Sequence, residues 1–97
     1  MEQSCIGSVV RSLCGRDRKR IFMIVGICEG TSDCVYVCDG RLHPLSKPKK
    51  KNLRHLAVLA AATEEGTSIL SGKSDEETFR YLESFERSKE EKDLLQN

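Results

Sequence analysis

Apolar residues in the N-terminal part of the chain occur in short runs that turn-forming residues separate. Residues 5–12 are rich in β-branched side chains, and residues 20–28 form a longer run that is apolar enough to be buried. Residues 34–38 are again mostly apolar and follow a loop-like segment. Short runs of this kind, bounded by Gly, Asp and Ser, predict three successive β-strands.

Asp39-Gly40 is the clearest local turn signal, because Asp-Gly suits the two positions of positive φ in a type I′ hairpin. It predicts a two-residue turn from the third strand into a fourth strand over residues 41–45. Pro44 and Pro48 then interrupt regular strand pairing, which predicts a loop over residues 46–52.

Residues 53–60 resume an extended or helical run. About four or five short strands joined by tight turns predict a mainly-β fold, a small β-barrel over residues 4–60. Residues 60–65 could be helical, and Gly66 and Gly72 interrupt the segment that follows. We therefore expect a linker over residues 61–73, whose conformation the sequence leaves open.

A helix is predicted over residues 74–95. Ser74 and Glu77 have the spacing of a capping box. In this motif the Ser74 hydroxyl accepts from the Glu77 backbone N–H, and the Glu77 side chain reaches back to the Ser74 backbone N–H. Four aromatic or aliphatic residues form one apolar stripe on this helix: Phe79, Tyr81, Leu82 and Phe85. The stripe favours a helix that caps the barrel over an independent docking helix.

The net charge of +1 hides an asymmetry between the two parts of the chain. Residues 1–56 contain eleven Lys/Arg and five acidic residues, whereas residues 57–97 contain five Lys/Arg and ten acidic residues. A basic body with an acidic tail suggests that the body meets a polyanion. The alternative is ordinary solvation of a charged surface.

Composition argues against several classes of protein. The longest apolar run is far shorter than the roughly 20 residues of a membrane span, and no signal peptide precedes it, so we expect a cytoplasmic protein. Five cysteines, at positions 5, 14, 28, 34 and 38, predict free, reduced thiols. Their spacing with His43 does not suit a metal site, and no cofactor is implied.

Several short segments follow one another in a distinctive order: residues 7–12, Gly15-Arg16-Asp17, residues 22–27, Asp39-Gly40-Arg41, Lys47-Pro48-Lys49, Lys51-Asn52 and His55-Leu56. In this order the chain resembles the KOW-domain RNA-binding proteins of bacteria, which are related to KOW-bearing large-subunit ribosomal proteins of archaea and eukaryotes. The resemblance implies an SH3-like β-barrel with a C-terminal α-helix, and binding to RNA, ribosomal RNA in particular, close to translation.

Lys19 departs from the family pattern. The family usually has a glycine just after Gly-Arg-Asp-x, and a lysine adopts a positive φ only at a cost. Either the turn has a different shape in this chain, or the glycine is not needed at a positive φ.

Two basic clusters, one over residues 16–20 and a second over residues 47–54, have the chemistry for RNA phosphates. Arginine can bind two phosphate oxygens, and lysine acts as a point charge. Pro48 stiffens the second cluster. With neighbouring hydrogen-bonding residues, the expected RNA-binding residues are Arg11, Arg16, Arg18, Lys19, Arg20, Lys47, Lys49, Lys50, Lys51, Asn52, Arg54 and His55. The aromatic residues are too few for a platform that stacks a single strand.

Other functions are less well supported. The second basic cluster, taken alone, is also compatible with a solvated loop or a nuclear-localisation signal. No nucleophile–base pair and no enzyme motif is evident, so we expect neither an enzyme nor a small-molecule substrate. The rival hypothesis is a protein-interaction module whose SH3-like barrel or C-terminal helix docks a partner protein.

Overall fold

The computed structural model describes residues 6–30 and 33–96, and side chains as far as Phe85. The described part contains one antiparallel sheet and two α-helices. In chain order the elements are β1 (Val9–Ser12), β2 (Ile21–Ile27), β3 (Cys34–Cys38), β4 (Lys49–Asn52), the 3-10 helix η2 (Leu53–His55), β5 (Leu56–Ala60), α1 (Glu64–Gly72) and α2 (Asp75–Gln96).

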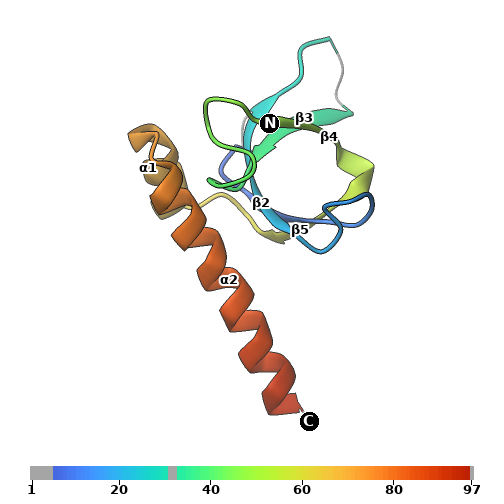
Figure 1. Cartoon of the computed structure of the whole chain (residues 1–97), viewed down its shortest axis with the longest axis vertical. Coiled ribbons are helices and arrows are strands. Elements are labelled where there is room, and N and C mark those ends of the chain that lie inside the picture. Colours follow the sequence, from blue (N-terminus) through green and yellow to red (C-terminus); the bar gives the residue numbers. More distant parts are fainter. Residues whose placement is uncertain (1–5, 31–32, 97) are drawn as a thin grey trace.

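The five strands are ordered β4-β3-β2-β1-β5, and each hydrogen-bonds its neighbours in antiparallel register. η2 connects the two outermost strands directly, so the sheet must curve until its edges approach each other. Figure 1 shows the strands curling into a small barrel-like ring with α2 on one side. The expectation of a mainly-β, barrel-like fold is confirmed at this level.

The interior of the ring is filled by alternate residues of the strands, because side chains of a β-strand point to opposite faces in turn. Its buried side chains are Val10, Phe22, Ile24, Val35, Val37 and Leu56. Phe22 and both β3 valines are at most 2% exposed. The apolar sequence of β2 and β3 therefore predicts these two strands correctly.

A second cluster lies on the outer side of β1 and β2. Val9, Ile21 and Met23 pack there against Tyr81 and Leu82 of α2, and all five are buried. The helix therefore covers the sheet through the apolar stripe of its first turns. α2 begins where its N-terminal signal predicts, with the Glu77 N–H donating to Ser74 Oγ at 3.2 Å.

The expected linker, residues 61–73, contains α1, so the conformation that the sequence left open there is mostly helical. Thr63 begins this helix, because its hydroxyl accepts from the Gly66 N–H, and it also hydrogen-bonds the Tyr81 hydroxyl at 2.9 Å. Lys73 ends the helix in the left-handed conformation with φ 53°. The helix forms because the Thr63 cap and the contact with α2 outweigh the two glycines of the segment.

The Asp39-Gly40 hairpin and a strand over residues 41–45 are also wrong. The Asp39 carboxylate accepts from the backbone N–H groups of Arg41 and His43, both at 2.9 Å, which closes a wider loop. Residues 49–52, three lysines and an asparagine that were expected in a loop, form β4 and pair with β3. The first strand begins at Val9 and not at residue 5; residues 4 and 5 lie outside the described part.

The expectation that all the cysteines are free is wrong for two of them. Cys28 and Cys34 form a disulfide across the β2–β3 turn, with Cα atoms 5.6 Å apart, a normal separation for a disulfide. Cys14 and Cys38 are free. Burial, with help from the nearby charges of Asp39 and Asp75, raises the pKa of the Cys38 thiol to about 12.

Candidate nucleic-acid interface

The first basic cluster lies in the turn between β1 and β2, residues 15–20, which we call the basic turn. Its backbone is fixed by hydrogen bonds from Arg18 N to Gly15 O and from Arg20 N to Asp17 O, at 3.2 and 2.9 Å. Lys19 has φ 73° and donates its N–H to Ser12 O at 2.8 Å. Lys19 therefore adopts a positive φ itself, and the turn has a left-handed residue at this position.

The basic turn exposes every one of its cationic side chains: Arg16, Arg18, Lys19 and Arg20. Its only acidic residue, Asp17, points the other way and is 5% exposed. The turn therefore presents positive charge outward and its single carboxylate inward.

The second basic cluster, residues 47–55, is called the basic strand segment because β4 forms its centre. In β4, Lys49 and Lys51 pair with the buried valines of β3, and Lys50 pairs with exposed Tyr36. Strand alternation therefore directs Lys49 and Lys51 toward the interior side of the barrel and Lys50 toward the outside.

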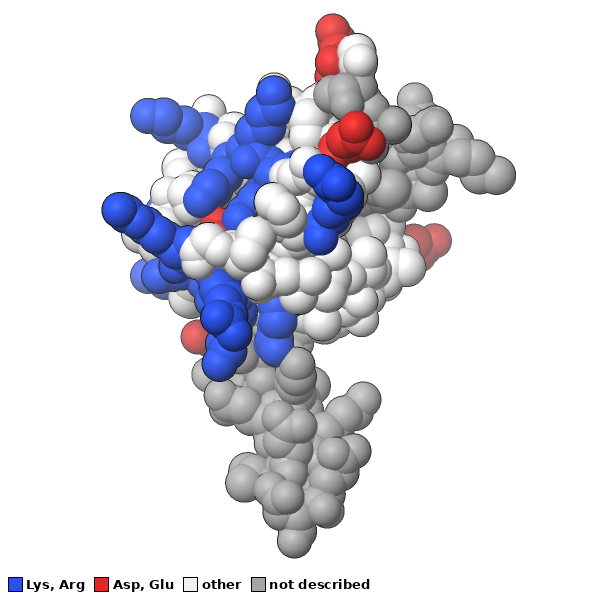
Figure 2. Space-filling model, turned by 90° about the vertical axis from the view of Figure 1, so that its right-hand side faces the viewer, with Lys and Arg blue, Asp and Glu red and all other residues white. Residues whose placement is uncertain are grey.

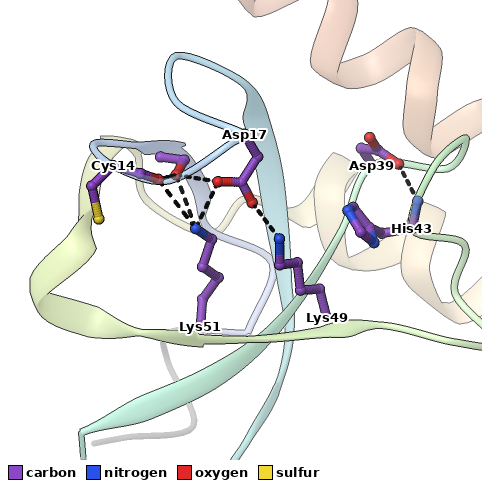
Figure 3. A network of polar contacts seen from close by, with 7 residues as sticks. Cys14, Asp17, Asp39, His43, Lys49 and Lys51 are labelled. Atoms are coloured by element: carbon purple, nitrogen blue, oxygen red, sulfur yellow. Dashed lines mark hydrogen bonds and ion pairs between the residues drawn. The ribbon is translucent and has the colours of Figure 1, made fainter.

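Lys49 and Lys51 both reach Asp17 (Figure 3). Lys49 Nζ lies 2.9 Å from Asp17 Oδ2, and Lys51 Nζ lies 2.7 Å from Asp17 Oδ1. Ser12 Oγ donates to Asp17 Oδ1 at 3.0 Å and accepts from Lys51 Nζ at 3.1 Å. One buried carboxylate thus connects β1, the basic turn and β4.

Asp17 is ionised in this network. Burial by itself would raise its pKa, but hydrogen bonds from Lys51, Lys49 and Ser12 hold the pKa well below the usual range of an aspartate. Asp17 is therefore negatively charged at neutral pH and binds the ammonium groups of two β4 lysines, Lys49 and Lys51.

The two lysines differ in what remains available to a ligand. The Lys51 side chain is only 10% exposed and also lies 3.5 Å from Cys14 O, so its ammonium group is fully engaged inside the protein. The Lys49 side chain is 37% exposed. Lys51 is therefore a structural residue of the interface, whereas Lys49 also borders the solvent.

The remaining expected residues differ in their exposure. Lys47, Lys50, Arg54 and His55 are exposed, and Asn52 caps η2 by accepting from the Arg54 N–H at 2.9 Å. Strand alternation places Arg11 on the side of β1 that carries Val9, and its Nε atom is buried without a hydrogen-bond partner among the described residues.

Lys and Arg side chains gather over the part of the barrel that Figure 2 displays. Together the basic turn and the basic strand segment carry nine Lys/Arg residues and one carboxylate, that of Asp17. Two segments far apart in the sequence thus lie together on the barrel, since the Asp17 ion pairs join them directly.

Sequence reasoning missed Ser12 and Asp17, which connect the two clusters, and Tyr36, which lies beside Lys50. Gly15-Arg16-Asp17 marks the turn in the sequence, but nothing local shows that its carboxylate bonds lysines more than thirty residues away. The sequence signal for Tyr36 is its hydroxyl group, in a strand whose other four residues are buried.

No family model and no curated protein matches this chain. Within the described residues, neither α-helix has the length and apolar character to cross a membrane. In the same part of the chain, no three His, Cys, Asp or Glu side chains come together as a metal site would require.

Proposed function

We propose that this chain is a small RNA-binding protein with an SH3-like, KOW-type barrel, and that it binds structured RNA, ribosomal RNA in particular, in the cytoplasm. It acts by binding and not by catalysis. The observation that carries the proposal is the Asp17 network, which joins two basic segments that together contain nine Lys/Arg residues.

Such a surface suits a phosphate backbone. Affinity for RNA comes largely from neutralising phosphates and releasing their counterions. The basic turn exposes three arginines and a lysine, and the basic strand segment exposes Lys47, Lys50 and Arg54. Arginine forks bind two phosphate oxygens at once, which favours a fixed orientation on the RNA.

The Asp17 ion pairs divide the residues that we propose for RNA binding into two kinds. Lys51 and, in part, Lys49 hold the interface together through Asp17, so the phosphate contacts fall to the exposed cations. Arg54 and His55 stand at the end of this surface on η2, where the Asn52 cap holds their backbone. Recognition is mainly of backbone and shape.

The test is binding of the intact chain to purified ribosomes and to a labelled RNA hairpin at several salt concentrations. We expect affinity to fall steeply with salt, and the double variant Arg18→Gln/Lys50→Gln to bind more weakly. The slope of log affinity against log salt should decrease by roughly 0.7 to 0.9 for each phosphate contact that is lost.

Arg80→Gln is the control, because Arg80 is 71% exposed on α2 and forms an ion pair with Glu76 of the same helix. It removes an exposed positive charge outside the two basic segments. An equal loss of affinity in the control, or binding that does not respond to salt, would contradict the proposal.

A further inference from the structure

Tyr36 is the exposed aromatic residue of the sheet. Its side chain leaves the outer face of β3, where the residue is 36% exposed, between Gly26 on β2 and Lys50 on β4. Directly paired residues in adjacent strands have Cβ atoms about 4.5 to 5.5 Å apart, so the Lys50 side chain rises beside the ring.

A groove of about 620 Å³ lies over this ring. Apolar residues from separate segments form its walls: Val25 of β2, Leu45 and Pro48 of the β3–β4 loop, and Leu70 of α1. The volume is within the range of about 300–1,000 Å³ that small ligands occupy in proteins.

The loop wall of the groove is fixed by hydrogen bonds. The Leu45 N–H donates to Asp75 Oδ1 at 2.7 Å, and the Lys47 N–H donates to Pro44 O at 2.9 Å. The groove is therefore formed before any ligand arrives, and a ligand does not have to order the loop.

Gly26 keeps one side of the groove open. A Cβ atom at this position would lie 3.6 Å from Tyr36 Cδ2, in ordinary van der Waals contact, and Gly26 does not have a positive φ. A larger side chain would thus be tolerated by the backbone and would cover the tyrosine ring. The glycine leaves the ring accessible.

The charges around the groove favour an anionic ligand with a flat apolar part. Lys50 stands beside Tyr36, and Lys73 lines the groove at the end of α1. The acidic residue of the lining, Asp75, already accepts a hydrogen bond from the Leu45 N–H. A nucleotide combines an aromatic base with a phosphate and matches this arrangement.

We infer that this groove binds one unpaired RNA nucleotide, whose base stacks on Tyr36 while its phosphate lies beside Lys50. The inference rests on the proposed RNA binding and adds to it a site for a single-stranded loop or bulge. A lone exposed tyrosine accommodates one base, which agrees with a chain that has too few aromatic residues to stack a longer strand.

Tyrosine fluorescence reads this site directly. The chain has no tryptophan and two tyrosines, and Tyr81 is 9% exposed and hydrogen-bonded to Thr63, so quenching by a stacked base reports mainly on Tyr36. The probes are an RNA hairpin with an unpaired loop and a fully paired RNA duplex with the same number of phosphates. We expect the hairpin to quench the emission and the duplex to leave it nearly unchanged.

Three variants sharpen the experiment. Tyr36→Leu removes the ring and should weaken hairpin binding by between about fivefold and about a hundredfold, the usual range for loss of one base–aromatic stack. Tyr36→Phe keeps the ring and should retain binding while it abolishes the quenching. Gly26→Val fills the groove and should act like Tyr36→Leu, although valine suits a β-strand. Duplex binding and its salt slope should change little in all three.

The outcomes separate this inference from the proposed function. If Tyr36→Leu and Gly26→Val bind the hairpin as the unaltered chain does, while Arg18→Gln/Lys50→Gln binds weakly, the nucleotide site is wrong and RNA binding stands. If neither RNA binds at low salt, both proposals fail. Quenching by a proline-rich peptide, with none by RNA, would overturn the inference in favour of peptide docking.

Discussion

Lys51 Nζ lies 2.7 Å from Asp17 Oδ1, and the two side chains are only 10% and 6% exposed. A buried ion pair adds little stability compared with two apolar residues. Removal of one partner, however, leaves an uncompensated charge in the protein interior, which solvates it poorly. The pair therefore makes the basic turn and β4 depend on each other. It also divides the lysines of β4 into structural and exposed ones.

The first prediction compares neighbours in β4. Lys51→Gln should lower the free energy of unfolding by about 3 kcal/mol, since it leaves the Asp17 carboxylate with only part of its charge compensation. Lys50→Gln, on the exposed side of the same strand, should change it by less than about 0.5 kcal/mol. Urea unfolding followed by circular dichroism measures both, and similar losses for the two variants would contradict the assignment.

The second prediction concerns pH. Because the pKa of Asp17 is lower in the folded protein than in the unfolded chain, the unfolded chain binds an extra proton below its own carboxyl pKa of about 3.9. The contribution of Asp17 is complete above that value, and it is lost as the pH falls toward the folded pKa. The free energy of unfolding should then decrease by up to about 1.4 kcal/mol per pH unit from this residue alone.

Asp17→Asn is the control for the pH experiment, since it removes the titrating group. Urea unfolding between about pH 5 and about pH 2.5 should show a smaller decrease in the variant than in the unaltered chain. The variant should begin from a lower stability, because the Lys51 ammonium loses its carboxylate. Parallel curves for the two proteins would show that Asp17 has an ordinary pKa when folded.

The third prediction follows from Lys19, which has φ 73° in the basic turn. The left-handed conformation costs a non-glycine residue about 1–2 kcal/mol, which a glycine would avoid. Glycine also makes the unfolded chain more flexible, and this cancels part of the stabilisation. Lys19→Gly should therefore raise the free energy of unfolding by about 0.5–1 kcal/mol. Arg18→Gly, at a neighbouring position without a positive φ, should lower it.

The sequence identified the strands whose residues are buried. β3 has the predicted bounds, and β2 lies within the predicted residues 20–28, because burial and strand propensity agree there. β4 was unpredictable from local pattern, since the sequence Lys49–Asn52 is polar throughout. It becomes a strand because β3 offers a free edge and Asp17 offers a carboxylate, and both partners are distant in the sequence.

The Asp39-Gly40 turn shows how a strong local signal can be overridden. Gly40 does have a positive φ, of 81°, as an Asp-Gly turn requires. The Asp39 carboxylate, however, bonds two later N–H groups, and a Cβ on Gly40 would collide with the backbone of Asp75 at the start of α2. The glycine thus serves a close approach to the helix, which only the tertiary structure reveals.

The basic clusters themselves were evident from the sequence, whereas their connection was not. Charge runs indicate where cations lie along the chain, but they do not distinguish Lys50, which faces solvent, from Lys51, which faces Asp17. That distinction depends on strand register, and a shift of one residue would reverse it.

The last prediction concerns the disulfide between Cys28 and Cys34, which closes a short loop across the β2–β3 turn. A cross-link over a loop of this size restricts the unfolded chain and is worth about 2 kcal/mol in the chain-entropy account. Dithiothreitol should lower the free energy of unfolding by about that amount. The Cys28→Ser/Cys34→Ser variant should already have the lower value and should not respond to the reductant, whereas Cys14→Ser, which alters a free thiol, should respond as the unaltered chain does. If the double variant Cys28→Ser/Cys34→Ser is as stable as the oxidised protein, the disulfide does not constrain the unfolded state.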